Sequence, residues 1–94
     1  VEINNLLKKR SYGLVRDRYG SPISMALIRA VDVHGKLKST VVTGEDGKFQ
    51  LNLNPGLYRL DVSRAGYRSV KTQAFKIDKI QDIGRLDLRL EKLS

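Results

Sequence analysis

The sequence has 94 residues, 40% of them hydrophobic and 30% charged, with a formal net charge of +8 and no cysteine. A chain of this length supports one hydrophobic core, and the lack of cysteine excludes disulfides, a thiolate nucleophile and a cysteine-ligated metal site. The longest apolar run is too short for a membrane helix, so we expect no membrane insertion by this domain.

The first ten residues do not share the pattern of the rest. Ile3, Leu6 and Leu7 are spaced as on one face of a helix, and residues 8–10 are all basic, which suits a helix C-terminus. Ten residues are marginal for a free helix, so we interpret residues 1–10 as a tail or linker, helical or disordered. Because the chain begins with Val1, we expect it to be part of a longer protein. Residues 11–94 are predicted to form the single domain.

From residue 11 onward, apolar residues recur at every second position, which is typical of half-buried strands. Turns rich in glycine, proline and aspartate separate these runs. The predicted strands span residues 12–17, 23–33, 37–44, 48–53, 57–63, 69–77 and 85–93. Seven short strands with no helix between them predict an all-β fold, a seven-stranded antiparallel Greek-key β-sandwich of the transthyretin-like or Ig-like kind.

The alternation also predicts which side chains face the core. The expected inward residues are Phe49, Leu51, Leu53, Tyr58, Leu60 and Val62. In the last strand Leu86, Leu88 and Leu90 share one side, and in the second strand Ala26, Ile28 and Ala30 share one face while Leu27, Arg29 and Val31 share the other. The phase of the sixth run slips between Val70 and Phe75, which predicts a bulge or bend. Asn54, Pro55 and Gly56 predict a type II turn with a positive φ at the glycine. Residues 78–84 are predicted to be a loop.

The glycines of residues 42–67 lie at strand ends and do not lead into a helix, so they predict turns and not a phosphate-binding loop. His34 is the one histidine and lies in a loop, where a metal or hydrolytic role would need further ligands or partners. Glu45 and Asp46 are neighbours at a turn beside solvent, where nothing would prepare a carboxyl group for acid catalysis, so we interpret them as turn residues. We therefore expect no enzyme activity, no metal and no cofactor.

Several short motifs, "DGKF", "PGLYRL" and "AGY", together resemble the carboxypeptidase regulatory-like domain, a β-sandwich family related in fold to transthyretin (prealbumin). The resemblance covers Tyr12 to about Ile77, and its motif residues here are Gly47, Phe49, Pro55, Gly56, Tyr58, Gly66 and Tyr67. The resemblance implies a non-catalytic module found in surface and secreted bacterial proteins, attached to varied partners. It favours an extracytoplasmic or membrane-associated location.

The positive charge is spread along the chain, with one modest basic cluster in its second half. The cluster consists of Arg59, Arg64, Arg68, Lys71 and Lys76. The sequence places a single acidic residue, Asp61, near them. One interpretation is that these are solvated outward faces of strands in a spacer or docking domain whose partner is another protein or a neighbouring domain. The alternative is a basic face that binds nucleic acid, acidic polysaccharide or acidic lipid with strong salt dependence. The missing row of stacking aromatics and the missing recognition helix argue against nucleic acid.

Overall fold

The computed structural model describes residues 12–93, the side chains of residues 80 and 81 excepted. The predicted tail over residues 1–10 therefore lies outside the described residues. In chain order the elements are β1 (Gly13–Asp17), β2 (Leu27–Asp32), β3 (Leu37–Val42), β4 (Lys48–Phe49), β5 (Gly56–Ser63), β6 (Val70–Lys71), β7 (Phe75–Ile77), the 3₁₀-helix η1 (Ile80–Arg85) and β8 (Asp87–Leu90). The described part of the chain contains no α-helix, which confirms the all-β prediction.

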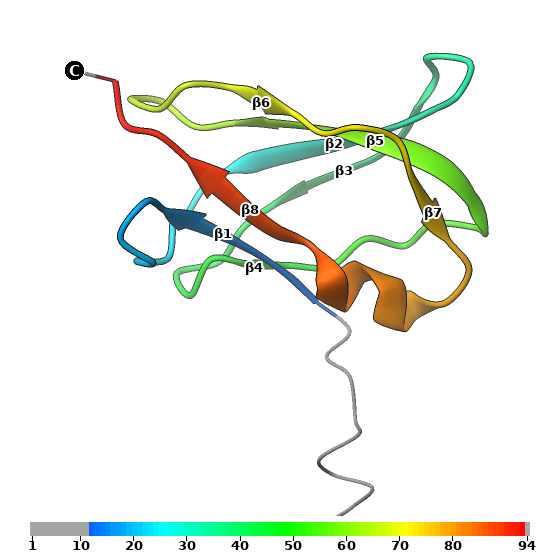
Figure 1. The fold of residues 1–94 in the computed structure, drawn as a ribbon, viewed down its shortest axis with the longest axis horizontal. Helices are drawn as coiled ribbons and strands as arrows, with labels where there is room; N and C mark the ends of the chain where they lie inside the picture. The colour runs from blue at the N-terminus through cyan, green and yellow to red at the C-terminus, as the bar shows by residue number, and fades with distance from the viewer. Residues whose placement is uncertain (1–11, 94) are drawn as a thin grey trace, which may run out of the picture.

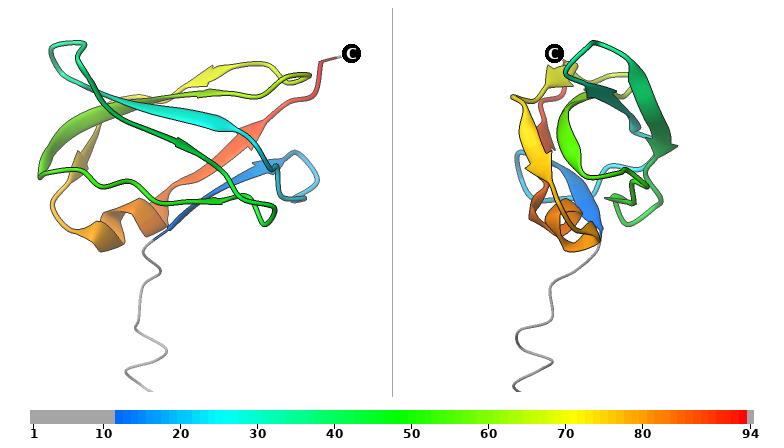
Figure 2. Two further views of the ribbon diagram at one scale, coloured as in Figure 1. Left: turned by 180° about the vertical axis from the view of Figure 1, so that it is seen from behind. Right: turned by 90° about the vertical axis from the view of Figure 1, so that its right-hand side faces the viewer.

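The strands form two sheets that face each other as a sandwich (Figures 1 and 2). The small sheet has the order β4-β1-β8, and the large sheet has the order β3-β2-β5-β6, with β7 also pairing to β5. All of the pairs between named strands are antiparallel except one, because β1 and β8 run parallel over four residue pairs, from Leu14–Asp87 to Asp17–Leu90. The first and last strands thus lie side by side in the small sheet and point the same way.

The strand count is eight and not the predicted seven, because the sixth predicted strand is interrupted. Residues 72–74 separate β6 from β7, and both of these short strands pair with β5. At the interruption, the Thr72 hydroxyl accepts the Leu60 N–H at 3.0 Å, while the Thr72 N–H donates to the Leu60 carbonyl at 2.9 Å. A side-chain oxygen therefore takes the place of a ladder acceptor, which confirms the bend predicted from the phase slip.

Other predicted boundaries differ from the structure for local reasons. The second strand begins at Leu27 instead of residue 23, because a turn with Met25 at a φ of 61° precedes it. Only Lys48 and Phe49 of the fourth predicted strand pair with a neighbour, although Leu51 remains buried. The last strand is shorter as well, from Asp87 to Leu90.

Two turn predictions were wrong. Gly56 does not have a positive φ, because it is the first residue of β5 and pairs with Ile77 in an extended conformation. The predicted loop over residues 78–84 is largely the 3₁₀-helix η1, which buries Ile83. The Asp82 carboxylate accepts the N–H groups of Lys79 and Asp78, and these hydrogen bonds lower the pKa of Asp82.

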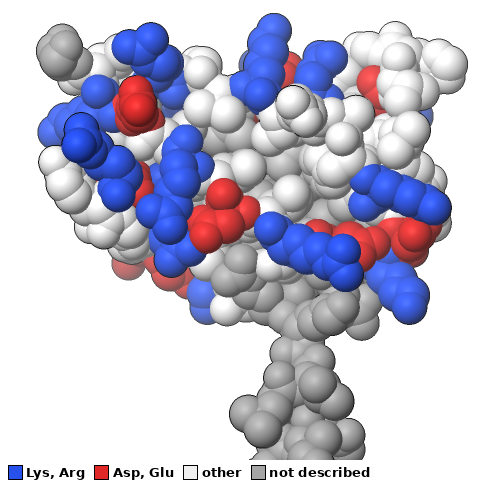
Figure 3. Space-filling view, in the orientation of Figure 1, with Lys and Arg blue, Asp and Glu red and all other residues white. Residues whose placement is uncertain are grey.

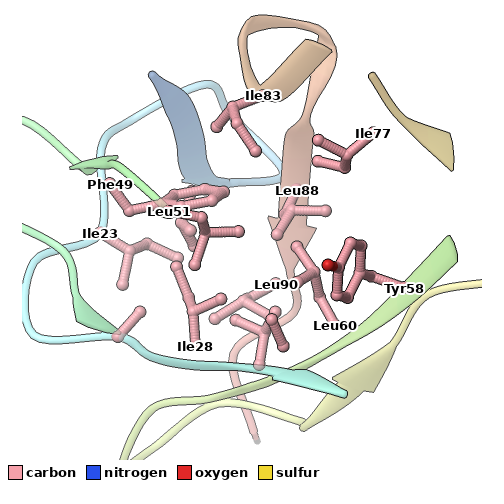
Figure 4. Packing of buried hydrophobic residues seen from close by; sticks show 14 residues of the cluster. Ile23, Ile28, Phe49, Leu51, Tyr58, Leu60, Ile77, Ile83, Leu88 and Leu90 are labelled. Atoms are coloured by element: carbon pink, nitrogen blue, oxygen red, sulfur yellow. The ribbon is translucent and has the colours of Figure 1, made fainter. Parts of the chain in front are cut away.

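The core lies between the sheets and draws on both (Figure 4). Of the twelve residues that the alternation placed on these faces, ten are buried and two, Leu53 and Leu86, are partly buried and packed against the core. The buried ten are Ala26, Ile28, Ala30, Phe49, Leu51, Tyr58, Leu60, Val62, Leu88 and Leu90. Burying such side chains stabilises the fold by about 1.5–3 kcal/mol each for the larger ones.

Candidate interaction surfaces

The five predicted basic residues do not converge on one spot. Arg59 lies on β5, Lys71 on β6 and Lys76 on β7, while Arg64 and Arg68 follow β5 in the segment that leads to β6. The ladder places Arg29 of β2 and Lys71 of β6 on either side of Asp61, at the centre of the outer face of the large sheet. Sequence reasoning did not include Arg29 in this group, because the residue is distant in the chain and only the β2–β5 pairing brings it there.

Three of the five basic side chains already have partners. Arg59 Nε lies 3.5 Å from Asp61 Oδ1, and Lys76 Nζ lies 3.6 Å from Asp78 Oδ2. Arg64 Nε donates to the Ser24 carbonyl at 2.7 Å and so ties the end of β5 to the segment before β2. Among the described residues, Arg68 and Lys71 are exposed and have no ion pair. The prediction of a basic interaction face remains untested by this geometry.

Charges of both signs alternate on the face of the molecule shown in Figure 3, where lysines and arginines lie beside aspartates and glutamates. On the small sheet, Asp87 forms an ion pair with Arg16 and lies 3.6 Å from Arg89 Nε. Exposed pairs of this kind contribute about 0–1 kcal/mol each to stability. This face therefore presents mixed charge instead of a single basic field.

The motif residues serve the fold. Gly47 has a φ of 74°, and a Cβ placed there would lie 2.5 Å from the Val15 carbonyl oxygen, so only glycine fits. The Phe49 ring covers Gly13, its partner in the β1–β4 register, where a Cβ would lie 2.3 Å from the ring. The Tyr58 hydroxyl donates to the Asn54 carbonyl, which fixes the turn that contains Pro55. Gly66 has a φ of 87°, and Tyr67 after it packs against the core.

A buried threonine joins the two sheets and was not recognised from the sequence as a core residue. Thr43 is 3% exposed; its hydroxyl accepts the Ala26 N–H at 2.9 Å and donates to the Ile23 carbonyl at 2.7 Å. Ile23 in turn donates its N–H to the Val15 carbonyl in β1. Period-two patterning predicts only that such a residue faces inward or outward, and the hydrogen bonds of a buried polar residue depend on the fold.

The residues considered for catalysis lie apart and open to solvent. His34, Glu45 and Asp46 are exposed, and no group of three or more metal-ligating side chains occurs within residues 12–93. Near His34, Asp32 caps the β2–β3 turn by accepting the N–H groups of His34 and Lys36. The hydrogen bond from Lys36 is the largest cause that lowers the pKa of the Asp32 carboxyl. This carboxylate caps the turn, and it also lies 3.8 Å from Lys38 Nζ.

The β3 edge of the large sheet is open. Among the described strands β3 pairs only with β2, and the Thr43 N–H bonds the Ala26 carbonyl. Since bonding alternates along an antiparallel ladder, the backbone groups of Thr40 and Val42 face away from β2. Beside this edge lies a groove of about 530 Å³, lined by Tyr12, Val41, Val42, Lys48, Phe49 and Gln50. The Lys48 ammonium lies 4.5 Å from the centre of the Tyr12 ring.

The chain enters and leaves the domain at opposite ends, as Figure 1 shows. Because β1 and β8 are parallel neighbours, the start of β1 lies at one end of the small sheet and the finish of β8 lies at the other. Beyond β8, residues 91–93 continue away from η1 and pair with residues 66–68. None of the described residues forms a helix long and apolar enough to cross a membrane.

In a comparison with protein-family models, the chain matches the carboxypeptidase regulatory-like domain over residues 12–91. The match covers nearly all of the residues that form the sandwich and extends past the segment that carries the sequence resemblance. A comparison with curated proteins found no match.

Proposed function

The chain belongs to the carboxypeptidase regulatory-like domain family, and we propose that it is an in-line spacer and docking module of a larger protein that is surface-associated or membrane-anchored in a bacterium. The family is generally non-catalytic, which agrees with the scattered and solvated positions of His34, Glu45 and Asp46. The module would hold the segments before and after it at a fixed separation while its surface engages another protein or a neighbouring domain.

The observation that carries this proposal is the parallel pairing of β1 with β8. In an antiparallel pairing of terminal strands, entry and exit lie at the same end, and the domain hangs from the chain as a side branch. Here they lie at opposite ends, so a chain that continues on both sides passes through the domain. The four paired residues alone separate the two ends by about 10 Å along the strands, at roughly 3.3 Å per residue, and residues 91–93 add to this.

The docking part of the proposal rests on the open edge of β3. Thr40 and Val42 present backbone donors and acceptors there, as an edge strand does when it pairs with an extended segment of a neighbouring polypeptide. The +8 charge opposes pairing with a second copy and favours a neighbour with acidic residues. The alternative, a module that binds nucleic acid, acidic polysaccharide or acidic lipid, would use Arg68 and Lys71 together with Arg29.

The spacer role is tested by measuring the separation of the two ends in the 94-residue chain. The sequence has no cysteine, so Tyr12→Cys with Leu93→Cys gives a unique pair of spin-label sites. We expect one narrow distance distribution in solution. A broad distribution that spans short and long distances would overturn the rigid spacer, since the ends would then not be held apart by the fold.

The anion-binding alternative is tested separately by titrating the chain with duplex DNA and with poly-L-glutamate at low and moderate salt. The spacer and docking proposal expects no binding that survives moderate salt. Saturable binding whose affinity falls steeply with salt, and which is weakened by Arg68→Gln with Lys71→Gln, would replace it with the anion-binding function. Thr40→Val on the opposite edge of the same sheet is the control that leaves the charge unchanged.

A further inference from the structure

We propose that the domain bears mechanical load: the parallel β1–β8 ladder, here called the terminal clamp, resists forced separation of the two ends of the chain. This inference rests on the proposed function, because a module through which a chain passes in line transmits any tension on that chain. The clamp consists of residues 14–17 of β1 and residues 87–90 of β8.

Tension applied through the two ends loads the terminal clamp in shear. A pull on the segment before Gly13 draws β1 backward along its own axis, and a pull on the segment after Leu90 draws β8 forward (Figure 1). The two strands can then separate only if all of the hydrogen bonds between them break together. A pull at right angles to the strands would break the same bonds one after another, which needs less force at any moment.

The strand β1 is held on both sides, so it cannot slide by losing one neighbour. On one side its Leu14 N–H donates to the Leu86 carbonyl at 3.0 Å, just ahead of the clamp. On the other side, the Val15 N–H donates to the Gly47 carbonyl at 2.8 Å and the Val15 carbonyl accepts the Ile23 N–H at 2.9 Å. The Val15 side chain is fully buried in the core.

Side chains also cross the terminal clamp. The Arg16 guanidinium contacts the Asp87 carboxylate, with Nε donating to Oδ1 at 3.2 Å. The Arg89 guanidinium donates to the Asp17 carbonyl at 3.2 Å. These two contacts join β1 and β8 at both ends of the register and must be lost before the strands can slide by one residue pair.

The exit side of the terminal clamp is tied to the large sheet. The Arg68 N–H donates to the Glu91 carbonyl at 2.8 Å, and the Leu93 N–H donates to the Gly66 carbonyl at 2.9 Å. Residues 66–68 follow β5, the strand that pairs with β2 over six residue pairs. Tension on the exit segment is therefore shared with the largest strand pair of the domain.

The test is single-molecule force spectroscopy on the 94-residue chain, pulled in two geometries. In the first, the handles are attached at the N-terminus and the C-terminus, which shears the clamp. In the second, the C-terminal handle moves to a unique Arg85→Cys, an exposed site just before β8, so that the pull opens the same ladder from one end. We expect the shear geometry to need at least about twice the unfolding force at equal loading rate, because forced unfolding follows the barrier along the pulled direction.

A matched pair of variants then locates the barrier. Val15→Ala on β1 and Val62→Ala on β5 remove the same atoms from sites that are 0% and 1% exposed, one inside the clamp and one outside it. Interactions that break at the barrier control the unfolding rate, so we expect Val15→Ala to lower the shear force clearly more than Val62→Ala. Equal forces in the two geometries, or equal losses in the two variants, would overturn the load-bearing role. Neither result would affect the spacer proposal, which the label-distance measurement decides by itself.

Discussion

The two sheets of this sandwich share one core but differ in how they are built. The large sheet has three longer strands, β2, β3 and β5, of six, six and eight residues, besides the short β6 and β7, and it carries Arg29, Arg59, Lys71 and Lys76 on its exposed side. The small sheet has strands of five, two and four residues, yet the chain enters and leaves the domain through it. Both sheets therefore contribute to the buried core, whereas the large sheet carries this group of basic side chains and the small sheet carries the two ends of the chain.

The difference shows what each sheet depends on. Long strands with inward side chains such as Ile28 and Leu60 are stabilised mainly by burial, which tolerates small backbone adjustments. Short strands have few ladder bonds, so the small sheet depends on the segments that lead into it. Gly47 and Ile23 both bond the backbone of Val15 from such segments. We therefore expect backbone changes near β1 to be the most damaging single changes in the molecule.

Gly47→Ala should have the largest effect. The φ of 74° already costs a residue with a Cβ about 1–2 kcal/mol, and the new atom would lie 2.5 Å from a backbone oxygen that cannot rotate away. We expect the free energy of unfolding to fall by more than about 3 kcal/mol, measured by chemical denaturation. Gly20→Ala is the control, with a φ of 86° and no atom within 4 Å of the new Cβ; it should cost only about 1–2 kcal/mol.

Similar losses in these two glycine variants would break the comparison at its strongest point. The clash with Val15 would then be relieved by a small shift of the turn, and the small sheet would not depend on the close approach of Gly47 to β1.

Thr43→Val should have the next largest effect, because it removes the link between the sheets. The change keeps the shape of the side chain but leaves the Ala26 N–H and the Ile23 carbonyl without their partner at a buried site. Leaving such groups unpaired costs about 1–3 kcal/mol. Thr40→Val on exposed β3 is the matched control and should change stability by less than about 0.5 kcal/mol. If the thermal unfolding midpoints of the two variants coincide, the hydroxyl of Thr43 does not join the sheets.

Much of this architecture follows from the sequence by local rules. Alternation along 57–63 predicts the inward positions of Tyr58, Leu60 and Val62, since a strand has a period of two whatever its partners are. The phase slip before Phe75 predicts the break between β6 and β7 for the same reason. The family resemblance carried by Gly47 and Phe49 was confirmed by the family model.

What the sequence does not reveal is set by pairing between distant segments. Nothing in "YGLVRD" or "RLDLRL" indicates that these strands lie side by side and parallel, because pairing and direction depend on the whole topology. The short helix that buries Ile83 also lacks a readable period, since six residues span too few turns. The position of Arg29 beside Asp61 is of the same kind, and the local sequence holds no signal for it.

Asp32→Asn should have the smallest of the three effects, and it concerns the β2–β3 turn of the large sheet. Hydrogen bonds from the N–H groups of Lys36 and His34 lower the pKa of Asp32 below its ordinary 3.8, so the folded state favours the carboxylate. The stability that the Asp32 carboxylate contributes is therefore fully present above pH 3.8, its ordinary pKa, and is lost as the pH falls through the lowered pKa of the folded state. In that pH range the unfolded chain binds the proton more readily than the folded chain does. Asparagine can still accept both hydrogen bonds but does not titrate.

We thus expect wild type to be more stable than the Asp32→Asn variant at neutral pH, and the difference to shrink steadily below pH 3.8, when free energies of unfolding are measured across that range. Asp46→Asn is the control at the β3–β4 turn, where the carboxylate accepts one backbone N–H, from Lys48, instead of two; it should change the free energy of unfolding at neutral pH less than Asp32→Asn does. A difference between wild type and Asp32→Asn that stays constant from neutral to acid pH would show that the charge of Asp32 does not stabilise the turn. The two hydrogen bonds to the side-chain oxygen would then stabilise the turn without help from the charge. The large sheet, like the small one, would depend at this turn on backbone geometry.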